Sequence, residues 1–295
     1  MYAQIAANRR KTFFLIFGFL VLIIAVGYFA ATYWDSPSVL VGAVVFSVVM
    51  SWGSYFAGDR AILALSGAQL LQPDADLGER QIGHLVENLC LTAGLPLPKI
   101  YLVNDPSPNA FAVGRDPGHA SIALTSGLIA QLDKPELEGV VAHELSHVKN
   151  YDILLATVII TLLGIITLLA DWMWRGRFFR SRDSRQEGGG LLIIIGLVLI
   201  ILAPIFAQLI YLTMSRQREY LADASGALLT RYPEGLANAL RKLAADPHRL
   251  KFANRATAGL YIVDPFRKMK EGAEELWSTH PPIQKRIQAL LKMNV

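Results

Sequence analysis

The chain has one cysteine among its 295 residues, and this scarcity excludes a class of small folds. Cys90 cannot form an intramolecular disulfide, so the protein is not a disulfide-stapled secreted domain. The excess of basic over acidic residues is also small, with a net charge of +4, and no basic tract is interleaved with aromatic side chains. We therefore expect no nucleic-acid partner. No segment repeats at a fixed period, which argues against a solenoid.

Charged residues are missing from four long apolar runs. The runs cover residues 13–33, 37–58, 153–170 and 191–214. Each is about as long as an α-helix must be to cross a bilayer core, so we predict four transmembrane helices. They explain why 53% of the residues are hydrophobic and the mean hydropathy is +0.37, above the range of ordinary soluble domains. A transporter is disfavoured because no run carries a charged residue in its interior.

The first two runs form a tight hairpin, and its flanking residues predict its orientation. Arg9, Arg10 and Lys11 precede the pair, whereas the connecting turn, residues 34–36, has no basic residue. By the positive-inside rule, we predict that the N-terminus and the stretch after the second run lie in the cytoplasm.

The segment 175–190, between the third and fourth runs, contains five arginines and ends in three glycines, which predicts a flexible loop. If both runs cross the bilayer, this loop lies outside the cytoplasm, against the positive-inside tendency. One alternative is a hairpin that enters the membrane without crossing it. Because both runs are long enough to cross, we retain four spans as the prediction.

Two stretches of globular composition alternate with the two pairs of spans. The prediction has four parts: an N-terminal transmembrane hairpin (1–58), the first half of a globular domain (59–152), a second transmembrane hairpin (153–214) and the second half of the domain (215–295). The second hairpin brings the two halves together at one face of the membrane.

The globular stretches carry signals for both helices and strands. Apolar spacing predicts helices over 61–71, 76–91, 233–245 and 282–293. Strands are predicted over 99–103, 109–114 and 119–124, the last two as a hairpin. Pro135, with Asp133 as the capping residue, opens the helix that contains residues 140–147. We expect an α+β membrane protein, mainly α, with a small antiparallel sheet.

The stretch 140–147 contains His143-Glu144-Leu145-Ser146-His147, a His-Glu-x-x-His pattern. On an α-helix the two histidines lie on one face, so both imidazoles can bind a single metal ion, for which zinc is expected. Glu144 lies beside the first histidine. It is placed to take a proton from a water molecule at the metal rather than to bind the metal itself.

A catalytic zinc usually has three protein ligands and one open position, and His, His, Glu is a recognised set. Glu219 follows the fourth apolar run, so a membrane hairpin returns it to the face that carries His147. Asp223, one turn further, is placed to accept the free N–H of a ligand histidine. The alternative is a solvated helix face in which both carboxylates pair with Arg216 and Arg218.

Four features, in this order, resemble the HtpX membrane metalloproteases, distant relatives of the CAAX prenyl proteases. They are the N-terminal apolar pair, the pattern at 143–147, Glu219 with Asp223, and Thr279-His280-Pro281-Pro282. The resemblance covers nearly the whole chain. It implies a zinc endopeptidase of the gluzincin kind in the bacterial cytoplasmic membrane, with its active site facing the cytoplasm. It also implies a role in stress-linked quality control of misfolded and membrane proteins.

The resemblance implies a role for each matching residue. His143, His147 and Glu219 would be the ligands of one Zn²⁺ per chain. Glu144 would be the general base, and His280 would stabilise the oxyanion of the tetrahedral intermediate.

The resemblance also implies that further residues support the site or bind substrate. Asp223 matches an acidic residue that supports a ligand histidine. Arg286 also fits the pattern, but the resemblance does not define its role. The motif Asn109-Ala110-Phe111-Ala112 matches the strand that edges the substrate cleft. An extended protein substrate would add there through backbone hydrogen bonds.

A different class of function stays open at this point: a catalytically silent adaptor in which zinc only holds a scaffold together. Structural zinc sites are usually cysteine-rich and closed, whereas two histidines and a glutamate leave one position open, so the sequence disfavours this class. A metal-dependent cleavage product would separate the two. Among proteases, the alternative is a CAAX-type enzyme, although four apolar runs are fewer than that branch usually has.

Overall fold

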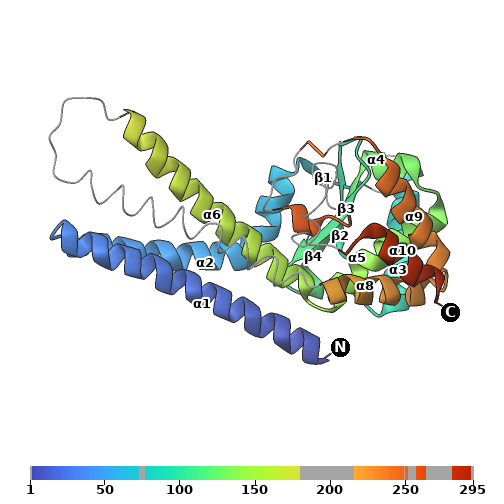
Figure 1. The fold of residues 1–295 in the computed structure, drawn as a ribbon, viewed down its shortest axis with the longest axis horizontal. Coiled ribbons are helices and arrows are strands. Elements are labelled where there is room, and N and C mark those ends of the chain that lie inside the picture. The colour runs from blue at the N-terminus through green and yellow to red at the C-terminus, as the bar shows by residue number, and fades with distance from the viewer. Residues whose placement is uncertain are drawn as a thin grey trace.

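The computed structural model describes residues 2–72, 77–179, 216–248, 250–251, 257–263 and 281–293. In this part of the chain, three long helices pack together and project from one side of a globular part (Figure 1). They are α1 (Tyr2–Tyr33), α2 (Pro37–Leu65) and α6 (Asp152–Phe179). Large hydrophobic side chains such as Phe13 and Trp52 are exposed on these helices, as lipid-facing side chains are expected to be.

Each long helix contains a stretch that is long and apolar enough to cross a membrane. These stretches are Gln4–Tyr33, Pro37–Leu65 and Asp152–Leu169. They agree with the first three predicted spans, whereas the fourth, 191–214, lies outside the described residues and stays a prediction. Helix α6 continues to Phe179, into the predicted arginine-rich loop 175–190, and the rest of that loop lies outside the described residues.

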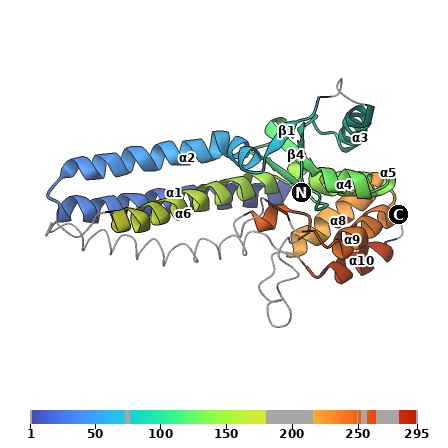
Figure 2. The same ribbon diagram turned by 90° about the horizontal axis from the view of Figure 1, so that it is seen from above.

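The first two helices form a hairpin whose closed end points away from the globular part (Figures 1 and 2). The turn is short because Asp35 adopts a left-handed backbone conformation, with φ 49°, and Pro37 opens α2. The N-terminal end of α1 therefore lies beside the globular part. Helix α6 packs along α1 through a hydrophobic cluster that includes Phe19, Val158 and Ile166.

The globular part contains a four-stranded sheet with the strand order β1-β2-β4-β3. Its strands are β1 (Ala68–Leu70), β2 (Lys99–Val103), β3 (Ala110–Gly114) and β4 (Ala120–Thr125). Strands β3 and β4 form the predicted antiparallel hairpin, and β3 is an edge strand. Strands β2 and β4 are parallel, so the sheet is mixed rather than antiparallel throughout. The local sequence identifies the hairpin, but not that β4 inserts between β2 and β3.

The sequence predicts one helix over residues 61–71, whereas the structure divides this stretch. Helix α2 ends at Leu65, Gly67 has a left-handed φ of 63°, and β1 follows and pairs with β2. Glycine ends helices readily in this conformation because it has no Cβ. A strand of three residues is too short to show an alternating pattern, so the apolar spacing favoured a helix.

Helix α5 lies at the centre of the globular part and contacts β3, α3, α8 and α9. The helices around the sheet are α3 (Leu77–Ala93), α4 (Ser126–Gln131), α5 (Lys134–Lys149), α8 (Arg216–Thr230), α9 (Pro233–Ala245) and α10 (Ile283–Leu291), with short 3₁₀ turns η1 (Pro117–His119) and η2 (Ala258–Leu260). Helix α5 begins as predicted, because Asp133 and Glu136 form a capping box around Pro135. Val140 and Val141 are fully buried in the main core. The predicted α+β, mainly helical class is confirmed.

Candidate active site

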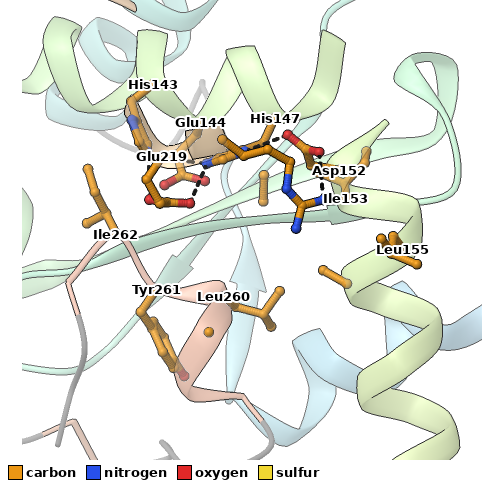
Figure 3. Close-up of a pocket in the computed structure, with 14 residues that line it drawn as sticks. His143, Glu144, His147, Asp152, Ile153, Leu155, Glu219, Leu260, Tyr261 and Ile262 are labelled. Carbon is orange, nitrogen blue, oxygen red and sulfur yellow. Dashed lines mark hydrogen bonds and ion pairs between the residues drawn. The ribbon is translucent and has the colours of Figure 1, made fainter. Parts of the chain in front are cut away.

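Two helices bring three metal-binding side chains to one point. Helix α5 supplies His143 and His147, one turn apart, and α8 supplies Glu219 (Figure 3). One ligand atom from each lies within 4.8 Å of the others, and the two histidine Nε2 atoms are 3.2 Å apart. The Glu219 carboxylate lies 3.7 Å from Nε2 of His143 and 3.6 Å from Nε2 of His147. Glu219 is 3% exposed, so it does not belong to a solvated helix face.

The other nitrogen of each histidine faces a carboxylate. His143 Nδ1 lies 2.9 Å from Asp223 Oδ1, and His147 Nδ1 lies 3.0 Å from Asp152 Oδ2. A carboxylate at Nδ1 fixes the ring orientation and keeps a proton on that nitrogen, which leaves Nε2 as the ligand atom. Both Nε2 atoms face Glu219. Two imidazoles and a carboxylate in this arrangement fit a divalent metal ion such as zinc.

Asp152 is the member of this arrangement that sequence reasoning missed. It stands just after the helix of His147, beyond the spacing of three or four residues that brings side chains together on one helix. The chain bends at Tyr151, whose φ of 59° is left-handed, and the bend places Asp152 against His147. The sequence signal for Asp152 is a carboxylate that follows soon after the second histidine. It indicates a contact with His147 only if the chain is known to bend at Tyr151.

Arg286, on α10, holds Asp223 from the other side. Its Nε and Nη2 atoms donate to the two carboxylate oxygens of Asp223 at 2.8 Å and 2.7 Å, and its Nη1 donates to the carbonyl of Ile262 at 2.8 Å. Burial opposes both charges. The contact nevertheless lowers the pKa of Asp223 and raises that of Arg286, so both stay ionised. The structure thus gives Arg286 a position that the sequence left undefined.

Burial changes the acid–base behaviour of Glu144. This side chain is 2% exposed, and loss of hydration raises its pKa to about 7, although the backbone N–H of Ala112 donates to it. A carboxyl group with such a pKa can accept and release a proton near neutral pH. General acid–base catalysis requires that property.

The two histidines differ in their affinity for a proton. Burial lowers the pKa of His143, and Asp223 offsets this effect only in part. Burial also acts to lower the pKa of His147, but the hydrogen bond to Asp152 and the charge of Glu219 raise it to about 9. A metal ion must displace the proton from its ligand, so metal binding here should weaken as the pH falls.

A pocket opens in front of these groups, and its other walls are mostly apolar. The start of α6 contributes Ile153, Leu155 and Ala156, and the segment 257–263 contributes residues 259–262 (Figure 3). A predicted membrane helix therefore forms part of the wall of the candidate active site. Apolar substrate side chains suit this wall best.

One part of the predicted substrate strand lines the pocket, and another part contacts the segment 257–263. Ala112 lines the pocket. Asn109 Nδ2 instead donates to the carbonyl of Val263 at 3.1 Å, and the Ala110 carbonyl accepts from the N–H of Ile262 at 3.2 Å. The chain's own segment therefore occupies one end of the strand edge assigned to substrate.

One further residue of the predicted substrate motif is not among those that line the pocket. Phe111 lies on the other face of β3, where its ring packs against Tyr261 with centroids 5.4 Å apart. His280 lies outside the described residues. Its predicted role stays a prediction.

The sequence and the fold are similar to those of known proteins. A family model described as peptidase family M48 matches residues 76–294. A protease HtpX homolog of Dictyoglomus thermophilum is 44% identical over 99% of this chain and 94% of its own length. One of Levilactobacillus brevis is 43% identical over 99% of this chain and 100% of its own length. The fold is similar to the crystal structure of S. mikatae Ste24p, with TM-score 0.51 and 18% identity, over 98% of this chain and 67% of that one.

Proposed function

Because this chain belongs to peptidase family M48 and is a membrane metallopeptidase, we propose that it is a zinc endopeptidase of the bacterial cytoplasmic membrane that degrades misfolded and membrane proteins under stress. The observation that carries the proposal is the convergence of His143, His147 and Glu219. Buried polar groups of this kind normally pair with one another or coordinate a metal.

The residues around the proposed metal position have distinct tasks. A zinc ion held by the three ligands would polarise the substrate carbonyl and lower the pKa of a water molecule. Glu144 takes a proton from that water and later delivers it to the leaving amine, as its pKa near 7 permits. Asp223 and Asp152 hold the two histidines with Nε2 toward the metal. His280 is retained as the proposed partner of the oxyanion.

The substrate is proposed to lie along the part of β3 that remains open. At one end Ala110 is bonded to Ile262, and at the other the N–H of Gly114 donates to the hydroxyl of Thr157 at 3.1 Å. Between them, the carbonyl of Ala112 points to the same edge, because alternate residues of a strand do so. A substrate backbone that donates to this carbonyl is recognised with little demand on its side chains. Such recognition suits an enzyme that degrades many misfolded proteins.

The active site is proposed to face the cytoplasm. The basic end of α1, which includes Arg9, Arg10 and Lys11, lies at the same end of the bundle as the globular part (Figure 2). Basic flanks of membrane helices prefer the cytoplasmic side. Because α6 starts immediately after the helix of His147, the site then lies at the membrane surface.

Purified full-length protein in lipid nanodiscs provides the test. We expect the zinc-loaded enzyme to cut a misfolded membrane protein faster than its folded form, and a chelator to stop cleavage until zinc is restored. His147→Ala should lower bound zinc well below one ion per chain, whereas His84→Ala, at a side chain that is 67% exposed, should not. Cleavage that persists in metal-free protein would refute the proposal.

A further inference from the structure

The N-terminal helix reaches the candidate active site through Asn8. This asparagine lies near the start of α1 and is 2% exposed. Its Nδ2 atom donates to Oδ1 of Asp152 at 2.7 Å and to the carbonyl of Asn150 at 3.0 Å. The other oxygen of Asp152, Oδ2, lies 3.0 Å from Nδ1 of His147. A single carboxylate therefore connects α1 to a candidate metal ligand.

Arg218, on α8, contacts the same side of this carboxylate. Its Nη1 atom donates to Asp152 Oδ1 at 3.2 Å and to Asn8 Oδ1 at 3.4 Å. Two residues thus hold Oδ1, and Oδ2 is directed at His147 (Figure 3). The Asp152 side chain is only 12% exposed, so little water is available to replace these contacts. Asp152 is also the first residue of α6, with no earlier turn of that helix to restrict its side chain.

Helix α1 is itself fixed against α6. Phe19 and Ile23 on α1 belong to one buried hydrophobic cluster with Leu154 and Val158 on α6. This packing determines the position of Asn8 relative to Asp152. The hydrogen bond between them therefore forms only when α1 is seated on α6.

We propose that Asn8 is a positioning residue of the metal site: it orients Asp152 toward His147, so that metal affinity depends on the seating of the N-terminal membrane helix. This inference rests on the proposed role of His147 as a metal ligand. It gives α1 a part in the active site in addition to membrane anchoring. Residues that support ligand histidines typically change metal affinity by about 10- to 100-fold when they are lost.

A double-mutant cycle on the full-length protein tests this role, with zinc affinity measured by competition against a fluorescent chelator. Asn8→Ala should weaken zinc binding about 10-fold, and Asp152→Ala by at least as much. In the Asp152→Ala protein, Asn8→Ala should change the affinity little further. Residues that act through one another are not additive, whereas a general loss of packing would add in both backgrounds.

Thr12→Val is the matched control. Thr12 is 3% exposed on α1, and its hydroxyl donates to the carbonyl of Asn8 within the same helix, so this variant should bind zinc like the wild type. If Asn8→Ala binds zinc as tightly as Thr12→Val, or weakens binding equally with and without Asp152, the positioning role is wrong. If the wild type binds no zinc, the proposed function fails as well.

A second variant distinguishes the loss of the contact with Asp152 from a folding defect in Asn8→Ala. Asn8→Ser leaves a small polar side chain at the same place, but its hydroxyl is too short to keep the contact with Asp152 Oδ1. It should show the same loss of affinity with an unchanged thermal unfolding midpoint of the metal-free protein. Wild-type zinc affinity in this variant would also overturn the inference.

Discussion

Arg286 is a fully buried cation whose guanidinium contacts both oxygens of Asp223. Arg286→Met would leave that carboxylate buried without its cation, and breaking a buried pair in this way typically costs about 3–5 kcal/mol. We therefore expect a large fall in the thermal unfolding midpoint. The matched control is Arg241→Met, because Arg241 is exposed on α9, and it should shift the midpoint little. Equal midpoints for the two variants would contradict a structural role for Arg286.

The buried thiol of Cys90 gives a prediction about pH. Burial raises its pKa to about 11 from 9.0, so the folded protein holds the thiol proton to higher pH than the unfolded chain does. At pH 8, where the reactive thiolate is scarce in both states, its fraction should be about 100-fold lower in the folded state. The contribution of this pKa difference to the free energy of unfolding is fully present below pH 9 and is lost as the pH rises through 11. Alkylation by iodoacetamide, followed by mass spectrometry, should be slow until denaturant is added, and equal rates would contradict the burial.

Helix α8 crosses α5 at Gly226, seven residues after Glu219. A Cβ at this glycine would lie 3.0 Å from the backbone nitrogen of His143. Gly226→Ala should push α8 away from α5, displace Glu219 and weaken zinc binding several-fold, because overpacking of this kind costs about 1–3 kcal/mol. Gly83→Ala, on α3, meets nothing within 4 Å and should stabilise the protein by roughly 0.5–1 kcal/mol instead. Zinc titration and thermal unfolding of both variants check this, and unchanged zinc affinity in Gly226→Ala would contradict it.

Local chemistry made several elements predictable from the sequence. Pro233 opens α9 and Asp133 caps α5, so both helices begin where proline and capping residues place them. The two histidines of α5 share a face because four residues separate them. The β3–β4 hairpin was also predictable, because its turn residues stand between two short apolar strands.

Contacts between distant segments were not predictable in the same way. The parallel pairing of β2 and β4 depends on how the chain crosses after β2, which no local pattern encodes. The contact between Asn8 and Asp152 could not be predicted from the sequence, because the two residues lie on different helices, more than one hundred residues apart. Glu219 could be proposed only because its carboxylate follows an apolar run that is predicted to return the chain to the same membrane face.

The three long helices and the basic start of α1 predict an orientation in the membrane that labelling can test. A membrane-impermeant maleimide should label Asp35→Cys, in the α1–α2 turn, in intact cells. It should label Arg241→Cys, exposed on α9, only after the cells are opened. Cys90 does not interfere because it is buried. The opposite pattern would place the active site outside the cytoplasm.

The same assay tests whether the fourth apolar run crosses the membrane. Ser184 lies in the arginine-rich segment, outside the described residues. If both flanking runs cross the bilayer, Ser184→Cys should be labelled in intact cells, like Asp35→Cys. Labelling only in opened cells would contradict four spans.

We propose that this membrane protein cleaves peptide bonds with a metal held by α5 and α8 and with Glu144 as the base. The most direct measurement compares wild type and Glu144→Gln for bound zinc and for cleavage of one denatured protein. We expect equal zinc content and loss of cleavage, because the proposed role of Glu144 is to move the proton without binding the metal. Cleavage by Glu144→Gln at the wild-type rate would contradict it.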